Sequence, residues 1–256
     1  MIPKIIHYCW FGGKPLPKLA QRCIASWKKY LPDYEIKEWN ESNFDVHCIP
    51  YCSEAYKARK YAFVSDYARF KILYEEGGLY FDTDVEIIRN MDHIIARGPF
   101  MGRERIIGPN MGDSAGVAPG LGLGVNPGLG LGVNPGLGLY KELLDLYGKL
   151  TFLNADGSLN IKTVVDYTTE VLEQHGYDPA LEEQQVAGIW IYPKEYFCPF
   201  DKKRRLVITE RTVSIHHYAG TWISRRLRLK KRVVDLIGKD ISYLIMMAKH
   251  RLCRGK

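Results

Sequence analysis

The first forty residues constrain the fold most, because they alternate between strand and helix patterns. An apolar run over residues 2–10 ends at Gly12-Gly13, which is typical of a buried strand that leads into a loop. Residues 16–31 then have a helical pattern, and residues 34–39 alternate polar and apolar side chains as a half-buried strand does. This order predicts a β-α-β unit, and with it an α/β fold that binds ligands at the carboxyl ends of its strands.

The length and composition fit one such domain with an appendage. The chain has 256 residues, of which 46% are hydrophobic and 25% charged, and this excludes a disordered or fibrous protein. No apolar run approaches the roughly 18 residues that span a bilayer, and the N-terminus lacks the pattern of a secretory signal, so we expect a cytoplasmic location. The six cysteines include no C-x2-C pair, and we expect them to be reduced packing residues.

The net charge of +7 is distributed unevenly along the chain. Residues 220–256 contain eleven Lys or Arg and two Asp, a local charge of +9, which leaves −2 for residues 1–219. Six of these cations lie within residues 225–232, and residues 241–252 have apolar positions at helical spacing. A basic helix with an apolar face is typical of adsorption to an anionic membrane, although a helix packed on the domain with solvated charges explains the same pattern. We expect one folded domain over residues 1–223 and a basic amphipathic helical tail over residues 224–256.

The longest helical pattern, residues 53–76, places two charged side chains on its inward side. At about 100° per residue, Asp66 and Arg69 fall opposite Lys60 and Lys71. Their i,i+3 spacing allows a buried ion pair, and it equally allows two groups directed at a ligand.

Two carboxylates follow the next apolar segment. Gly77-Gly78 ends the helical pattern, and the strand pattern after it contains Asp82 and Asp84, which strand alternation places on one face. Two like charges this close repel, and a shared cation explains their pairing. A later strand pattern ends at His216-His217, and imidazole is a suitable third ligand beside carboxylates.

Residues 119–139 contain a tandem repeat rich in glycine. The eight residues 120–127 recur at 128–135, and neither a G-x-G-x-x-G motif nor a P-loop motif is present. We expect an expanded surface loop or a short hairpin with no assigned chemistry.

Three blocks in chain order resemble glycosyltransferase family 32, over most of residues 1–223. The blocks are residues 2–13 with Trp10-Phe11-Gly12-Gly13, Ser65-Asp66-Tyr67-Ala68-Arg69-Phe70 with Gly77-Gly78-Leu79-Tyr80-Phe81-Asp82-Thr83-Asp84, and His216-His217-Tyr218-Ala219-Gly220-Thr221-Trp222. The resemblance implies a single Rossmann-like type A glycosyltransferase domain. Such a domain binds a nucleotide-sugar with a divalent cation, usually Mn²⁺ and alternatively Mg²⁺, and retains the anomeric configuration.

The resemblance also implies roles for individual residues. Trp10 would stack on the nucleobase, although core packing is the simple alternative, and Trp222 would cover the diphosphate. Asp66 and Arg69 would contact the donor ribose or sugar, and Asp82 and Asp84 would hold the metal and the ribose. The third metal ligand would be His217, which fits this position better than His216 because it lies five residues before Trp222.

The implied function is transfer of a hexose in capsular or surface polysaccharide biosynthesis. The donor would be a UDP-sugar such as UDP-galactose, or GDP-mannose, and the acceptor a saccharide or a lipid-linked oligosaccharide at the inner face of the cell membrane, where the tail would dock. A nucleotide-sugar hydrolase shares the same site. A non-catalytic nucleic-acid-binding protein that uses the basic tail is a further alternative, but the acidic body and the lack of a recognition motif count against it.

Overall fold

A computed structural model describes residues 2–104, 124–126, 131–133, 136–201 and 205–219 of the chain. The chain divides into two units, Met1–His217 and Tyr218–Lys256, and every helix and strand below belongs to the first. Trp222 and the expected tail lie outside the described residues, so the boundary at residue 223 stays a prediction.

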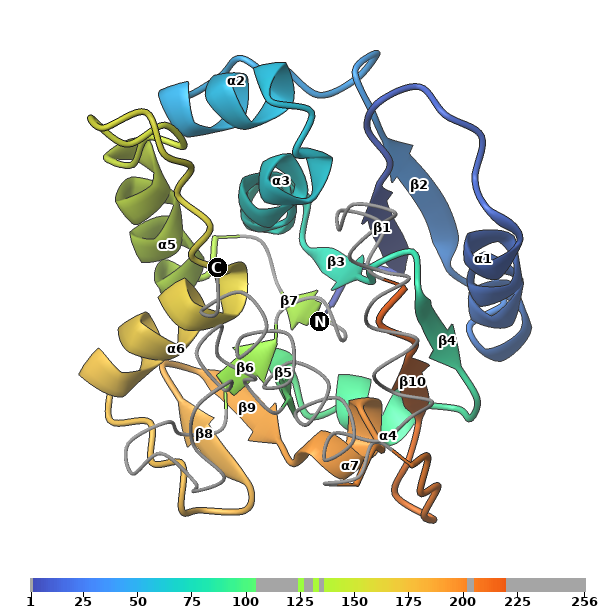
Figure 1. Cartoon of the computed structure of the whole chain (residues 1–256). Helices are drawn as coiled ribbons and strands as arrows, with labels where there is room; N and C mark the ends of the chain where they lie inside the picture. Colours follow the sequence, from blue (N-terminus) through green and yellow to red (C-terminus); the bar gives the residue numbers. More distant parts are fainter. Residues whose placement is uncertain (1, 105–123, 127–130, 134–135, 202–204, 220–256) are drawn as a thin grey trace, which may run out of the picture. The chain divides into compact units, whose positions relative to one another are not determined.

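A mixed sheet forms the centre of the first unit (Figure 1). Its strands lie in the order β2 (Glu35–Trp39), β1 (Ile5–Cys9), β3 (Gly78–Tyr80), β7 (Leu131–Val133), β5 (Phe100–Glu104), β9 (Ile189–Tyr192) and β8 (Gln184–Val186). Strand β1 is parallel to both β2 and β3, and β5 is parallel to β9, whereas β7 and β8 run antiparallel to their neighbours. The α/β class predicted from the sequence is confirmed.

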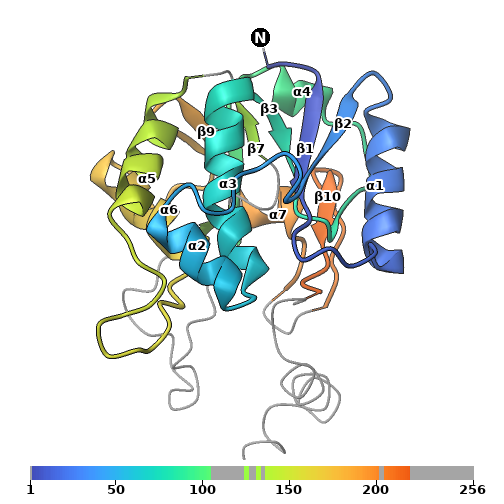
Figure 2. The ribbon, with the colours of Figure 1, turned by 90° about the horizontal axis from the view of Figure 1, so that it is seen from above.

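Helices α1 (Lys18–Tyr30) and α3 (Tyr61–Glu76) lie on opposite sides of β1 (Figure 2). Successive side chains of a strand point to opposite faces, so each helix meets its own set of β1 side chains. Trp27 of α1 is fully buried, and its ring centroid lies 5.8 Å from that of Tyr8 and 5.5 Å from that of Phe81. Helix α3 buries Asp66 and Arg69, as the helical pattern predicted.

The single helix predicted over residues 53–76 is two helices. Helix α2 (Pro50–Lys57) begins earlier, with Pro50 in its first turn, and α3 begins after a break. At the break Arg59 has φ +56°, in the left-handed region, and Lys60 N–H donates to the carbonyl of Ala55 at 2.8 Å. A residue in the left-handed region at the end of a helix is usually glycine. Because an arginine occupies this position, the sequence carries no sign that the helix is interrupted here.

The remaining helices are α4 (Asp92–Ile95), α5 (Gly138–Gly148), α6 (Val164–Gln174) and α7 (Lys194–Phe197). A capping box of Thr163 with Asp166 starts α6. An isolated bridge pairs Phe200 with Leu206. No helix in the described part of the chain is long and apolar enough to cross a membrane.

The sequence predicts an expanded surface loop or a short hairpin at residues 119–139, but two segments of the repeat are strands that each pair with β5 in the central sheet. Residues Gly124–Asn126 form β6, which pairs with β5, and β7 lies within the sheet between β3 and β5. Each strand comes from a different copy of the repeat. The Gly-Leu alternation has the period of a strand, a signal that the glycine content obscured.

A second, two-stranded sheet pairs β4 (Val85–Ile87) antiparallel with β10 (Ser214–His216). The sequence predicted one strand through residues 79–86, but β3 ends at Tyr80 and a turn leads to β4, in which Val85 N–H donates to the Asp82 carbonyl at 2.9 Å. This turn contains both carboxylates of the Asp-x-Asp motif.

Candidate active site

The turn between β3 and β4 holds Asp82 and Asp84 at the carboxyl end of a central parallel strand. Phe81 N–H donates to the His7 carbonyl at 3.2 Å, which continues the pairing of β3 with β1 as far as the turn. The Tyr80 hydroxyl donates to Asp82 Oδ1 at 3.3 Å. The motif therefore lies at the sheet edge where α/β folds bind ligands.

Strand β10 brings a histidine to these carboxylates. Asp82, Asp84 and His216 each offer one ligand atom, and the three atoms lie within 4.8 Å of one another. His216 Nε2 is 3.3 Å from Asp84 Oδ1. Two carboxylates and one imidazole form a donor set that suits a divalent cation such as Mn²⁺ or Mg²⁺. The structure thus brings Asp82 and Asp84 together with an imidazole, as expected from the sequence.

The neighbouring histidine, which the sequence argument preferred, has a different partner. His217 Nε2 lies 2.6 Å from Glu86 Oε2, and Arg22 Nη2 lies 3.2 Å from the same oxygen. Adjacent residues at the end of a strand point to opposite sides, so only one of the two histidines reaches Asp84. The structure places His216 in this position, and the spacing from Trp222 could not reveal that choice.

The inward charges of α3 join the same network. Arg69 Nη2 lies 3.0 Å from Asp66 Oδ1 and 3.3 Å from Asp82 Oδ1, and its guanidinium lies 4.9 Å from the ring centroid of Tyr80. The sequence left a buried ion pair and a ligand-directed pair as alternatives. The ion pair is present, and it also connects α3 to the Asp-x-Asp turn.

Burial dominates the electrostatics of these carboxylates. It raises the pKa of Asp66 to about 7, against the opposing effect of Arg69. It also raises the pKa of Asp82, again opposed by Arg69 and reinforced by the charge of Asp84. One guanidinium therefore compensates the buried negative charge only in part, and a bound cation would lower both pKa values.

Trp10 lies just beyond the end of β1, in the loop that leads to α1. Its side chain is partly exposed, and its indole N–H donates to the Lys14 carbonyl at 2.5 Å. The loop requires glycine, because Gly12 has φ +94° and a Cβ there would lie 2.3 Å from the ring of Tyr61. The partial exposure disfavours simple core packing for Trp10, and its role in stacking stays a prediction.

Sequence reasoning missed Glu86 and its partner Arg22. The signal that would have found Glu86 is its spacing, because Asp82, Asp84 and Glu86 are three acidic residues at every second position. Nothing comparable marks Arg22, whose place follows only from the packing of α1 against β4.

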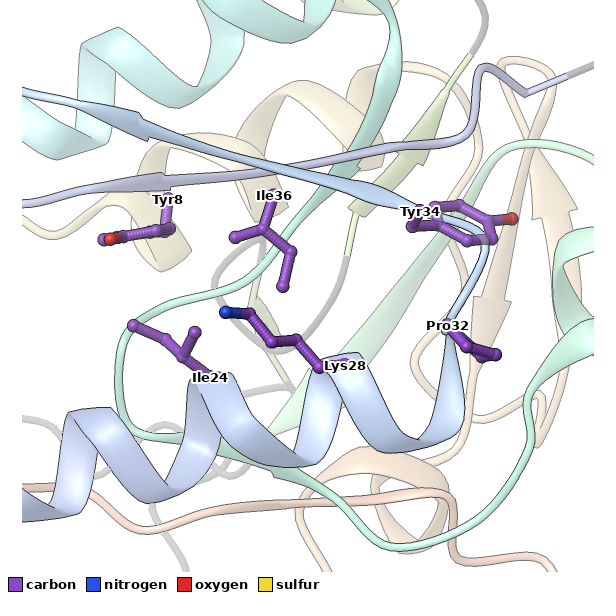
Figure 3. Close-up of a pocket in the computed structure, with 6 residues that line it drawn as sticks. All are labelled: Tyr8, Ile24, Lys28, Pro32, Tyr34 and Ile36. Atoms are coloured by element: carbon purple, nitrogen blue, oxygen red, sulfur yellow. The ribbon is translucent and has the colours of Figure 1, made fainter.

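An open hollow of about 530 Å³ lies between α1 and the sheet (Figure 3). It is lined by Tyr8, Ile24, Lys28, Pro32, Tyr34 and Ile36. The Tyr8 hydroxyl is bonded to Glu38 Oε2 at 2.5 Å. The hollow shares no residue with the Asp82, Asp84 and His216 cluster, so it is a separate feature of the surface.

The segment that contains the Asp-x-Asp motif is similar to known glycosyltransferases. Residues 17–101 match the family described as glycosyltransferase sugar-binding region containing DXD motif. Over 110 residues the chain is 32% identical to an uncharacterized glycosyltransferase of Acanthamoeba polyphaga mimivirus, covering 39% of this chain and 42% of that protein. Over 101 residues it is 30% identical to inositol phosphoceramide mannosyltransferase 3 of Schizosaccharomyces pombe, covering 37% of this chain and 27% of that protein.

Among solved structures, the PaToxG glycosyltransferase matches with a TM-score of 0.48 and 20% identity, covering 68% of this chain and 69% of that one. The chain spans less than half the length of the two curated relatives. The resemblance to glycosyltransferases drawn from the sequence is confirmed over part of the chain: residues 17–101, which include Asp82 and Asp84, match the model of a glycosyltransferase sugar-binding region containing a DXD motif.

Proposed function

We propose that the chain is a metal-dependent, retaining glycosyltransferase of the type A class. It transfers a hexose from a nucleotide-sugar, a UDP-sugar such as UDP-galactose or GDP-mannose, to a saccharide acceptor. The observation that carries the proposal is the cluster of Asp82, Asp84 and His216 at the carboxyl end of β3. Asp82 and Asp84 lie within the segment that matches the DXD family, and His216 lies outside it.

In this proposal Asp82, Asp84 and His216 hold the divalent cation. The cation, when bound, neutralises the charge that develops on the departing nucleoside diphosphate. Asp66 and Arg69 bind the donor sugar or ribose. Arg69 Nη1 is buried and has no hydrogen-bond partner among the described residues, so it has N–H groups available for a hydroxyl or phosphate oxygen.

The reaction needs no covalent enzyme intermediate. A front-face substitution balances without a covalent nucleophile. In that step the bond from the anomeric carbon to the phosphate oxygen breaks, and a bond to the acceptor oxygen forms on the same face of the sugar. The acceptor hydroxyl passes its proton to the departing phosphate oxygen.

The wider role proposed is capsular or surface polysaccharide biosynthesis. Trp10 would stack on the nucleobase and Trp222 would cover the diphosphate. The basic tail would hold the enzyme at the inner face of the membrane, next to a lipid-linked acceptor. The tail argument rests on the charge and apolar spacing of residues 224–256 alone.

A metal-dependence experiment tests the proposal. A thermal-shift panel of nucleotide-sugars with Mn²⁺ first selects the donor, because a ligand that binds the native state raises its melting temperature. With that donor, we expect Asp84→Asn to abolish Mn²⁺-dependent transfer by protein stripped with EDTA. The control is Asp145→Asn, an exposed residue of α5 paired with Lys141, which should keep the wild-type rate.

Wild-type transfer by Asp84→Asn would contradict the metal assignment. The same assay separates the alternatives, since a hydrolase releases free sugar at the same rate with and without a saccharide acceptor. Steeply salt-dependent binding of random duplex DNA would instead support the nucleic-acid alternative.

A further inference from the structure

Strand β4, which directly follows the Asp-x-Asp motif, is held along both of its edges. On one edge it pairs with β10, where His217 N–H donates to the Asp84 carbonyl at 2.9 Å. On the other edge no strand is paired with it in the described part of the chain. Its outward Val85 carbonyl and Ile87 N–H are among the groups that a further strand would bond.

Side chains of α1 take the place of that missing strand. The Trp27 indole N–H donates to the Val85 carbonyl at 2.8 Å, and Ile87 N–H donates to Ser26 Oγ at 2.9 Å. Ser26 Oγ in turn donates to the Cys23 carbonyl at 2.6 Å, which orients its lone pairs toward Ile87. Two outward backbone groups of the strand, the Val85 carbonyl and the Ile87 N–H, therefore bond to adjacent residues of one helix.

A third contact from α1 reaches the outer side chain of β4. Arg22 Nη2 lies 3.2 Å from Glu86 Oε2, the oxygen that also contacts His217. Figure 1 shows α1 alongside β4. The helix thus contacts three consecutive residues of the strand, two through the backbone and one through the side chain.

These contacts act one residue away from the cluster. Val85 follows Asp84 in the chain, and its partner across the two-stranded sheet is His216. A shift of β4 along or away from β10 would therefore move Asp84 relative to His216. Contacts that orient metal ligands from outside the coordination sphere commonly control metal affinity.

We propose that Ser26 and Trp27 of α1 are positioning residues that set the geometry of the Asp82, Asp84 and His216 cluster. The inference rests on the proposed function, because it assumes that the cluster binds a divalent cation. It adds that α1, which contributes no residue to the cluster, determines the affinity for that cation.

The test measures Mn²⁺ affinity of the full chain by direct titration. Ser26→Ala removes the acceptor for Ile87 N–H, and Trp27→Phe keeps a buried ring but removes the donor to Val85. Each variant should bind Mn²⁺ up to roughly 10-fold more weakly, the lower end of the cost of losing a direct contact to a metal ligand, because Ser26 and Trp27 act on the residues that follow Asp84. Ser26→Thr retains the hydroxyl and should restore affinity, and the Ile87 amide should exchange faster in Ser26→Ala than in Ser26→Thr.

A matched control separates positioning from general loss of stability. Thr163→Ala removes the N-cap of α6, which should lower the melting temperature and leave Mn²⁺ affinity unchanged. The inference is overturned if Ser26→Ala and Trp27→Phe bind Mn²⁺ as tightly as wild type, or if Thr163→Ala weakens binding equally. If wild type itself shows no saturable Mn²⁺ binding, or Asp84→Asn binds as well as wild type, the metal site of the proposed function fails together with the inference.

Discussion

A single histidine, His7, is locked in one neutral form by its two hydrogen-bond partners. The Trp39 indole N–H donates to His7 Nδ1 at 3.0 Å, so Nδ1 must be unprotonated. Nε2 lies 3.0 Å from the Gly77 carbonyl and must therefore carry the proton. Burial lowers the pKa of His7 from 6.5 to about 4, which adds to the cost of protonating Nδ1. This residue links β1 to the glycine turn that precedes β3.

The lowered pKa of His7 predicts how the stability of the fold depends on pH. Because the unfolded histidine binds a proton more readily than the folded one, the stabilisation is fully present above about pH 6.5 and is lost as pH falls toward 4. A difference of this size corresponds to about 3 kcal/mol in the free energy of unfolding. Urea titrations at pH 7 and pH 4.5 should show a smaller loss of stability for His7→Gln than for wild type. The exposed His47→Gln serves as control and should lose as much as wild type, and equal losses in all three proteins would contradict the prediction.

At the scale of the element, the two copies of the repeat place strands against the same neighbour. Strand β6 uses the Gly-Val-Asn of the first copy and β7 the Leu-Gly-Val of the second, and both pair with β5. Only β7 also pairs with β3. A single copy of the repeat therefore supplies the strand between β3 and β5.

Deleting one copy should therefore leave the fold intact. Removal of residues 128–135 joins the first copy directly to Gly136, and this gives the same sequence as removal of residues 120–127. The remaining copy can fill the position of β7, and the strand then lost is β6, which lies off the main strand order and pairs with β5. We expect a melting temperature within a few degrees of wild type, about 1 kcal/mol or less in stability, and unchanged Mn²⁺ affinity. Deletion of residues 120–135 should instead unfold the protein or lower its melting temperature strongly; equal effects of the two deletions would contradict this interpretation.

The elements that the sequence predicted well are those with a regular period. Strands β1 and β2, helix α1 and the inward side of α3 follow from apolar spacing, and spacing also predicted that Asp66 and Arg69 point inward. The break at Arg59 was missed because a non-glycine residue adopts positive φ there. The sequence argument did not identify His216 as the partner of Asp84. His216 and His217 point to opposite sides at the end of β10, and the pairing of β10 with β4 decides which of them faces Asp84. Local periodicity thus predicts elements, whereas contacts between elements decide which side chains meet.

For the whole molecule, the uneven charge predicts two different kinds of partner. The body, residues 1–219, has a net charge of −2, and a bound cation with Arg69 would supply the local positive charge that an anionic donor needs. The charge of +9 over residues 220–256 has the sign that an anionic surface attracts.

Membrane binding should accordingly require the tail and anionic lipid. Each Lys or Arg near such a surface contributes about 1 kcal/mol, so the six cations within residues 225–232 would together contribute about 6 kcal/mol to adsorption. We expect the full chain to pellet with phosphatidylserine vesicles and to stay in solution with phosphatidylcholine vesicles or at high salt, since salt screens the attraction. A chain that ends at Trp222 should not pellet, and neither should a full-length variant with those six residues changed to Gln. This last variant distinguishes charge from tail length, and equal pelleting by wild type and both variants would refute docking through the tail and favour a tail whose charges are simply solvated.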